Sequence, residues 1–303
     1  MMKRLLLVAF IALVATLTIK GNDWLGQAEA EWPEFQAKAV VMLNADTGEW
    51  LYAGNGDKAL PPASMSKMMT ELLILEDVRE GRLRWEDAVE ASDYAANVPG
   101  AEMRLKAGQS YTVEELFAAM TVHSANDAAV ALAERSAGSE AEFVERMNAK
   151  AREIGLSKKT AFGNATGLSR QDLLAFAEAS SAKDTVMTAK DVALLARHLI
   201  TSFPEIVRFT TESAAPGPGE NAGETVRLQT TNEMLPGQRF GTAGNDGLKT
   251  GYTESAGYCF TGSFLRGGER YITVVMGTET PEARFEETAK LLDAAWGKEG
   301  TPG

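Results

Sequence analysis

The chain has 303 residues, of which 45% are hydrophobic and 24% charged, and it carries a formal net charge of −12. This composition is typical of a globular protein with a large core, and the acidic balance argues against nucleic acid and anionic lipid surfaces as partners. The single cysteine excludes an internal disulfide and the two histidines are scattered, so we expect neither a metal nor another cofactor.

Residues 1–30 have the pattern of an export signal. Lys3 and Arg4 precede an apolar run over residues 5–19, and residues 28–30 offer a small-x-small cleavage site. The run is shorter than the roughly 20 residues that a bilayer span requires. The stretch between the run and the cleavage site is long for a signal peptide, so an uncleaved N-terminal anchor stays open. We expect export, with the membrane contacted only through this segment if it is not cleaved.

Periodicity and turn residues predict the elements that follow residue 31. Pro61 and Pro62 precede an apolar run, so a helix is expected to begin near Ser64. Thr112 and Glu115 form a capping box that opens another helix. In chain order we expect a hairpin over 39–52, helices over 64–81, 112–121, 128–135 (capped by Asp127) and 140–154, a loop over 162–168, a helix over 188–199, a loop over 212–224, strands over 257–265 and 270–277, and a helix over 281–296, with 83–111 irregular.

Strands at both ends of the chain enclose a helical middle. This order predicts an α+β fold with one antiparallel sheet and helices on both of its faces. No repeat and no linker interrupts residues 31–303, so we expect a single domain there.

Ser64 and Lys67 place a hydroxyl beside an amine at the predicted helix start. Lys67 follows Ser64 by one turn on the same face, where the helix dipole is positive and backbone N–H groups are free. A serine nucleophile needs a base that takes its proton and N–H donors for the developing oxyanion. The amine must be neutral to act as that base, so we expect burial or neighbouring charge to lower the pKa of Lys67.

The Ser-x-x-Lys spacing alone is weak, because Ser180 and Lys183 repeat it. Two further motifs distinguish the copies: residues 124–126 read Ser-Ala-Asn and residues 249–251 read Lys-Thr-Gly. The order Ser-x-x-Lys, Ser-x-Asn, Lys-Thr-Gly is typical of penicillin-binding proteins and serine β-lactamases. Only the copy at Ser64 keeps this order, so we interpret the copy at Ser180 as a coincidence in a loop or on a helix surface.

With the sequence around each motif, the chain resembles the serine-type D-alanyl-D-alanine carboxypeptidases, the low-molecular-mass penicillin-binding proteins of peptidase family S11. The resemblance is strongest in the segments at residues 62–70, 124–129 and 246–259, and it extends over residues 35–297. It implies the penicillin-binding-protein/β-lactamase-like transpeptidase fold with a helical subdomain. The implied reaction removes the terminal D-alanine from peptidoglycan stem pentapeptides that end in D-Ala-D-Ala, in the periplasm or extracytoplasmic cell-wall space, and β-lactam antibiotics such as penicillin would inhibit it covalently.

The resemblance also assigns catalytic roles to four residues. Ser64 would attack the carbonyl between the two D-alanines and form an acyl-enzyme, with Lys67 as its general base. Ser124 would relay a proton towards the leaving amine, and Asn126 would orient Lys67 and the substrate amide.

Five further positions are expected to bind substrate. Lys249 and Thr250 would bind the terminal carboxylate, and Gly251 would let the substrate lie close to the strand backbone. The backbone N–H groups of Ser64 and Tyr252 would form the oxyanion hole. Arg284 matches an arginine that some relatives place near the substrate carboxylate, although a surface helix arginine is the alternative reading.

Other readings stay open or are disfavoured. A D,D-transpeptidase shares the acyl-enzyme and differs only in the acceptor, so it remains an alternative, as does a non-catalytic penicillin-binding sensor or wall-binding module. A class A β-lactamase would need a deacylating glutamate in a Glu-x-x-Leu-Asn phrase, and none lies between Asn126 and Lys249. Few residues follow Trp296, so we expect no C-terminal β-rich domain. Cys259 and His123 are interpreted as structural, and Thr231 stands where some relatives carry an arginine.

Overall fold

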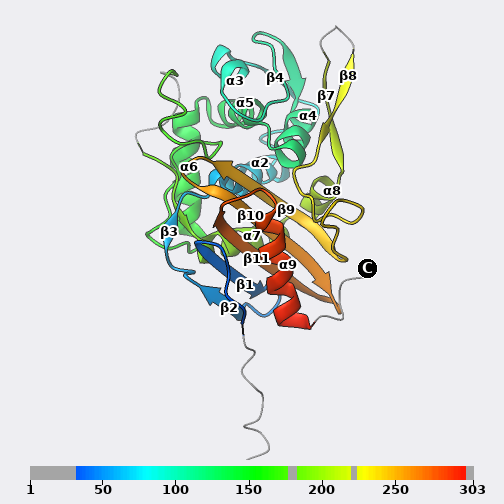
Figure 1. The fold of residues 1–303 in the computed structure, drawn as a ribbon. Helices are drawn as coiled ribbons and strands as arrows, with labels where there is room; N and C mark the ends of the chain where they lie inside the picture. Colours follow the sequence, from blue (N-terminus) through cyan, green and yellow to red (C-terminus); the bar gives the residue numbers. More distant parts are fainter. Residues whose placement is uncertain (1–31, 177–182, 220–223, 298–303) are drawn as a thin grey trace, which may run out of the picture. The chain divides into compact units, whose positions relative to one another are not determined.

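A five-stranded antiparallel sheet forms the centre of the computed structural model, with strand order β2-β1-β11-β10-β9 (Figure 1). The N-terminal hairpin pairs with the last strand, so that Val41 of β1 faces Val274 of β11. Both ends of the chain therefore build one sheet, as the order of predicted strands indicated. The strands are β1 (Ala39–Asn44), β2 (Trp50–Gly54), β9 (Asn245–Thr253), β10 (Gly257–Arg266) and β11 (Glu269–Thr278).

The structure describes residues 32–176, 183–219 and 224–297. The residues from Glu34 onwards form one compact unit. The expected export signal over residues 1–30, and Ser180 of the second Ser-x-x-Lys copy, lie outside the described residues. Among those described, no helix is both long enough and apolar enough to cross a bilayer.

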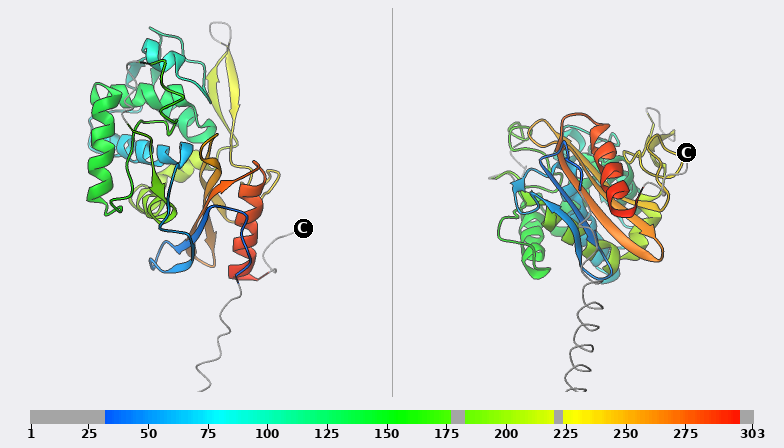
Figure 2. Two further views of the ribbon diagram at one scale, coloured as in Figure 1. Left: turned by 60° about the vertical axis from the view of Figure 1, so that its left-hand side comes forward. Right: turned by 60° about the horizontal axis from the view of Figure 1, so that its bottom comes forward.

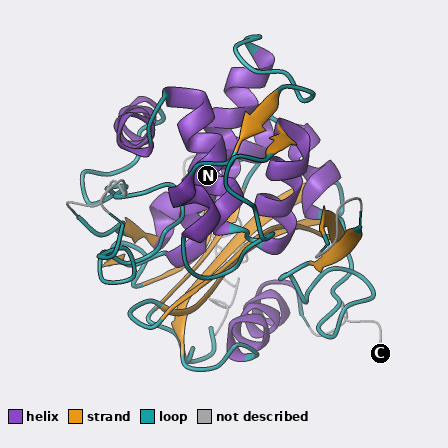
Figure 3. Cartoon of the chain, turned by 90° about the horizontal axis from the view of Figure 1, so that it is seen from above, coloured by secondary structure: helices purple, strands orange, loops and turns teal. Residues whose placement is uncertain are grey.

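Both faces of the sheet are covered, which confirms the predicted arrangement. Helix α7 (Ala189–Ser202) packs on β1 and β11, whereas α9 (Ala283–Trp296) packs on β10 and β11 from the opposite side (Figures 1 and 2). Seen from above, most helices lie on one side of the strands and α9 lies alone on the other (Figure 3). On the α9 face, the Phe260 ring meets the Phe285 ring at 5.1 Å. Strands buried on both faces explain the long apolar runs in their sequences.

Helix α2 (Lys67–Arg79) is the centre of the helical part of the molecule. All of its residues up to Asp77 are buried, as expected of a helix that is enclosed on every side. It packs against α5 (Asn126–Ala137), α6 (Glu140–Glu153) and α7. The shorter helical segments are η1 (Ala63–Ser66), α3 (Asp93–Asn97), α4 (Val113–Ala118), the π-helical η2 (Ala119–His123), η3 (Pro204–Ile206) and α8 (Val207–Thr210).

The predicted capping box is confirmed at the start of α4. The Thr112 side chain accepts from the Glu115 N–H at 3.2 Å, and the Glu115 carboxylate accepts from the Thr112 N–H at 2.8 Å. Ser139 and Thr188 cap α6 and α7 through side-chain oxygens that accept from the backbone N–H groups of Glu142 and Asp191. Local side-chain chemistry therefore sets where these three helices begin.

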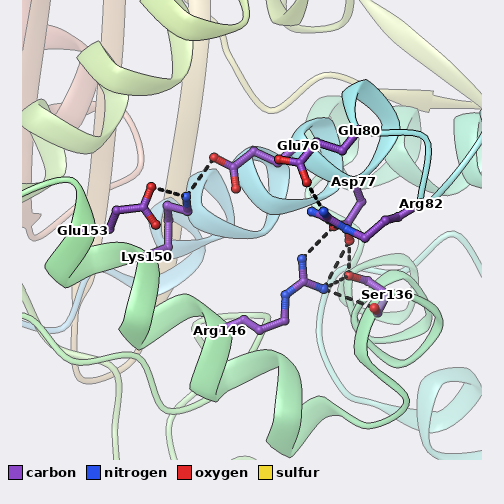
Figure 4. A network of polar contacts seen from close by, with 8 residues as sticks. All are labelled: Glu76, Asp77, Glu80, Arg82, Ser136, Arg146, Lys150 and Glu153. Atoms are coloured by element: carbon purple, nitrogen blue, oxygen red, sulfur yellow. Dashed lines mark hydrogen bonds and ion pairs between the residues drawn. The ribbon is translucent and has the colours of Figure 1, made fainter.

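A buried ionic network ties the end of α2 to α5 and α6 (Figure 4). The Asp77 carboxylate is 1% exposed and lies 2.6 Å from Arg82 and 2.7 Å from Arg146. It also accepts a hydrogen bond from Ser136 of α5. Two guanidinium groups and a hydroxyl contact the carboxylate, and these contacts offset the desolvation cost of its burial.

Two stretches are more regular than the sequence suggested. Residues 83–111 contain α3 and the start of a small ribbon, and the stretch 212–224, expected to be a loop, contains a strand. The prolines at 216 and 218 are compatible with that strand because a two-stranded ribbon consists only of edges, where alternate N–H groups need no partner. The small ribbons are β3 (Ala59–Leu60) with β6 (Met187–Thr188), β4 (Ala88–Glu90) with β5 (Ser110–Thr112), and β7 (Ala214–Pro218) with β8 (Thr225–Gln229).

Candidate active site

Ser64 and Lys67 lie together at the junction of η1 and α2. Ser64 is in the 3-10 turn and is partly exposed, whereas Lys67 begins the α-helix and its side chain is fully buried. Lys67 Nζ is 2.9 Å from Ser64 Oγ, as the spacing predicts. Ala63, just before the serine, has a left-handed φ of 49°. A reachable hydroxyl thus sits in front of a buried amine.

The contacts of Lys67 Nζ suit a neutral amine that receives a proton. Besides Ser64, its neighbours are Asn126 Oδ1 at 2.6 Å and the Thr166 carbonyl oxygen at 2.8 Å. The Asn126 amide is oriented by its Nδ2 group, which donates to the Pro99 carbonyl at 2.6 Å. Both oxygens around Nζ can therefore only accept, while the Ser64 hydroxyl can donate. A neutral amine would use its two N–H groups on the oxygens and direct its lone pair at the Ser64 O–H.

Burial and charge both favour the neutral form of Lys67. Removal from water lowers its pKa well below 10.5, and the neighbouring positive charge of Lys249 lowers it further. Glu71 and Asp127 act in the opposite direction but do not reverse the shift. The expectation that the site depresses this pKa agrees with the structure, and burial is the larger cause.

A second serine–lysine pair lies next to the first. Lys249 of β9 donates from Nζ to Ser124 Oγ at 2.7 Å. Ser124 follows the π-helical turn and has a left-handed φ of 68°, a conformation that is costly for a residue with a side chain. Burial, and secondarily the charge of Arg284, lower the pKa of Lys249 to about 8, while Glu71 raises it. The first and third motifs therefore meet through the second.

Gly251 lets β9 pack against the segment that carries the nucleophile. A Cβ atom at this position would lie 2.8 Å from the Pro62 carbonyl oxygen and 3.1 Å from the Ser64 nitrogen. The sequence had suggested that this glycine makes room for substrate. The structure supplies a different reason, because protein backbone itself fills the space beside the glycine.

The remaining predicted substrate residues lie around β9. Thr250 Oγ1 donates to Thr231 Oγ1 at 2.6 Å, so the position where some relatives carry an arginine supplies a hydroxyl here. Tyr252 is 52% exposed and stacks on Tyr258 at 4.2 Å. Arg284 of α9 lies over the same Tyr258 ring, at 5.6 Å from its centre. The charge of Arg284 also lowers the pKa of Lys249, and a role of Arg284 in substrate binding stays a prediction.

Thr166 is a site residue that the motifs did not indicate. Its carbonyl is held by a turn in which Asn164 Oδ1 accepts from the N–H groups of Thr166 and Gly167, at 3.1 and 2.7 Å. Glu140 supports the same loop by accepting from the Ala165 N–H at 2.9 Å. The Asn-x-Thr-Gly sequence predicts a turn. A residue that acts through its backbone carbonyl, however, has no sequence signature.

Asp127 does not cap α5, as the sequence had suggested. Helix α5 begins two residues earlier than expected, at Asn126, with Ala125 as its N-cap. The Asp127 carboxylate instead accepts from the backbone N–H groups of Met103 and Leu105, both at 3.0 Å. The hydrogen bonds to this distant segment replace the expected local cap. They also fix the backbone beside Asn126.

Two residues close to the motifs have structural surroundings. Cys259 is buried in β10, and burial raises the pKa of its thiol to about 11, so it is a poor nucleophile. His123 Nδ1 lies 2.9 Å from the Gln229 carbonyl oxygen, which ties the turn before Ser124 to β8. Neither residue touches the reacting groups.

Comparison with known proteins places this geometry in a family. The model of the D-alanyl-D-alanine carboxypeptidases, peptidase S11, matches residues 26–280. The carboxypeptidase DacF of Bacillus subtilis is 38% identical over 297 residues, which are 97% of this chain and 71% of that protein. For DacC of Escherichia coli the identity is 32% over 273 residues, 88% of this chain and 62% of that protein.

A solved structure confirms the expected fold. Penicillin-Binding Protein D2 from Listeria monocytogenes, in its ampicillin-bound form, superposes with a TM-score of 0.72 at 35% identity, over 87% of this chain and 98% of that one. The chain belongs to the D-alanyl-D-alanine carboxypeptidase family, the S11 serine peptidases.

Proposed function

We propose that the chain is a serine-type D-Ala-D-Ala carboxypeptidase that removes the terminal D-alanine from peptidoglycan stem peptides. The observation that carries the proposal is the environment of Lys67, whose buried amine faces the Ser64 hydroxyl and two oxygens that can only accept. The contacts place this amine beside an accessible nucleophile, and burial together with the charge of Lys249 lowers its pKa so that it can act as a base. Membership of the carboxypeptidase family supports the choice of substrate.

In the proposed acylation, Ser64 Oγ attacks the carbonyl carbon between the two D-alanines while its proton passes to Lys67 Nζ. The N–H groups of Ser64 and Tyr252 receive the oxyanion. When the C–N bond breaks, a proton passes through Ser124 to the leaving amine, and D-alanine departs. Water then attacks the ester carbonyl, and its proton replaces the one that Ser64 lost, which regenerates the enzyme.

The substrate's terminal carboxylate would bind at Lys249, Thr250 and Arg284. Lys249 and Arg284 are both cationic, and the charge of Arg284 lowers the pKa of Lys249. An anion placed between them relieves that repulsion, so the site favours substrates with a free C-terminal carboxylate. β-Lactam antibiotics carry a carboxylate beside a reactive amide carbonyl, and we propose that they acylate Ser64 and hydrolyse slowly.

The proposed substrate lies outside the cytoplasm, so the function requires export. The positively charged start, apolar run and small-x-small site in residues 1–30 support an export signal. N-terminal sequencing of the exported protein tests cleavage: a new terminus near Glu31 supports a signal peptide, and an intact Met1 or Met2 supports an anchor.

The decisive assay measures D-alanine release from a D-Ala-D-Ala-terminated stem peptide. Wild type should release D-alanine and become covalently labelled by fluorescent penicillin, and Ser64→Ala should do neither. Ser180→Ala is the matched control and should behave like the wild type. Labelling that persists in Ser64→Ala and disappears in Ser180→Ala would refute the choice of nucleophile.

An acceptor amine separates hydrolysis from transpeptidation. If wild type is labelled by penicillin but releases no D-alanine from the peptide alone, an acceptor dipeptide is added and the cross-linked product is measured. Product under these conditions would replace the carboxypeptidase proposal with a D,D-transpeptidase.

A further inference from the structure

Helix α2 carries a carboxyl that the proposed mechanism does not use. Glu71 lies one turn after Lys67 on the same face of the helix and is 1% exposed. No atom of the described residues forms a hydrogen bond with its Oε1 atom. A buried carboxylate with incomplete hydrogen bonding is expensive, so its presence in the core needs a physical reason.

The groups that face Glu71 are the catalytic lysines and one hydroxyl. Its charge interacts most strongly with Lys249 of β9 and less strongly with Lys67 of its own helix. The Thr121 hydroxyl of η2 favours the ionised carboxyl, although its Oγ1 atom forms no well-aligned hydrogen bond within the described residues. The lysines also interact with other charges: Arg284 lowers the pKa of Lys249, and Asp127 raises that of Lys67. Glu71 therefore acts on the site through its charge.

Asp77 on the same helix shows what a structural carboxylate looks like in this protein. It is equally buried, but Arg82 and Arg146 contact it within 2.7 Å (Figure 4). Asp127, another buried carboxyl close to the motifs, accepts three backbone N–H groups. Glu71 is different from both, since no comparable contact holds its Oε1 atom.

We propose that Glu71 is a positioning residue: it is the buried counter-charge of Lys249, which keeps Lys249 cationic for the substrate carboxylate while Lys67 stays a neutral base. The inference rests on the proposed function and adds a residue to it. The Glu71 anion and the Lys249 cation together leave the site without net charge. A second cation at Lys67 would be unbalanced: Glu71 raises the pKa of Lys67, but burial and the positive charge of Lys249 lower it by more, so the proton is held on the lysine that binds substrate.

The direction of the pH dependence follows from the same contacts. Burial raises the pKa of Glu71 to about 7 and lowers that of Lys249 to about 8. Below pH 7 the carboxyl is protonated, so Glu71→Gln changes no charge there. Above pH 7 the wild type has an anion that keeps the Lys249 proton in place, and Glu71→Gln lacks it. In the variant, Lys249 loses its proton at lower pH, and the alkaline limb of activity must move to lower pH.

The experiment compares kcat/KM for D-alanine release between about pH 5.5 and pH 9.5 in wild type, Glu71→Gln and Asp77→Asn. For Glu71→Gln we expect the alkaline limb to move down by about one pH unit, which is roughly a tenfold loss at pH 9, carried by KM. At pH 6 it should match the wild type. Asp77→Asn should lower the melting temperature and leave the profile in place. A superimposable profile for Glu71→Gln, or a loss of equal size at every pH, would overturn the proposal.

A second variant keeps the proposal testable if Glu71→Gln folds poorly. Glu71→Asp keeps the charge on a shorter side chain and should retain the alkaline limb of the wild type. A loss that is equal at all pH values in this variant would assign Glu71 to shape rather than charge and overturn the proposal. If the wild type releases no D-alanine, the proposed function has failed instead. The rate of acylation by penicillin, which also carries a carboxylate, then gives the same pH comparison.

Discussion

Gly251→Ala tests whether the packing of β9 against η1 positions the nucleophile. The new methyl group would lie 2.8 Å from the Pro62 carbonyl oxygen, 3.1 Å from Ala63 Cβ and 3.1 Å from the Ser64 nitrogen. All of these atoms belong to backbone or to a Cβ, so none can rotate away, and Ala63 already holds a left-handed φ. The strand and the turn must separate by a few tenths of an ångström.

The cost divides between stability and catalysis. Overpacking of this kind destabilises by about 2 kcal/mol. The displaced nitrogen is one of the two proposed oxyanion donors, and a misplaced catalytic group costs on the order of 100-fold in rate. Because the donor acts in the transition state, we expect kcat/KM for D-alanine release to fall through kcat.

Gly56→Ala is the matched control for the loss of stability. Its added Cβ would lie 2.9 Å from Val41 Cγ1, a contact of the same closeness that involves none of the motif residues. Both variants should have a lower melting temperature than the wild type, and only Gly251→Ala should lose activity. A Gly251→Ala enzyme whose kcat/KM stays within about threefold of wild type would refute the positioning argument.

Three further outcomes are expected. Lys67→Met keeps the buried volume and removes the base, so penicillin labelling should slow by on the order of 10²- to 10⁴-fold while the circular dichroism spectrum is retained; undiminished labelling would exclude Lys67 as the base. Arg146→Met leaves Asp77 with Arg82 and Ser136, and should lower the free energy of unfolding in urea by about 2 kcal/mol without altering kcat. Cys259, buried with a raised pKa, should resist thiol reagents until the protein unfolds, and rapid modification of the native protein would contradict its placement.

The parts of the fold with local causes were predictable from the sequence. The capping box at Thr112 sets the start of α4, and the alternating strands at the end of the chain pair as expected. The proline and glycine content of 212–224 predicts a loop, but the stretch contains the strand β7, because a two-stranded ribbon tolerates proline. The prediction that Asp127 caps a helix is wrong. Its carboxylate accepts from backbone N–H groups of a distant segment instead, and such a tertiary contact has no local sequence signal.

The candidate site shows the same division. Ser64 and Lys67 are three residues apart, so helix geometry alone brings them together. Ser124 and Lys249 are 125 residues apart, and only the resemblance to a known family related them before the structure. Thr166 contributes a backbone carbonyl, and a pattern of side chains cannot predict such a contribution. Glu71 was visible as a carboxyl inside an apolar run, but its significance depends on a lysine from another element.

The site gathers several features that oppose stability. Two lysines are buried there, and Ser124 is held in a left-handed conformation. The lysines are compensated locally: Lys67 by a lowered pKa and by two oxygen acceptors, and Lys249 by the hydroxyl of Ser124 and the charge of Glu71. These compensations act on protonation as well as on stability. Replacing Lys67 by an apolar residue of similar size should therefore remove function at little cost to the fold, because the cost of burying the amine is removed with it.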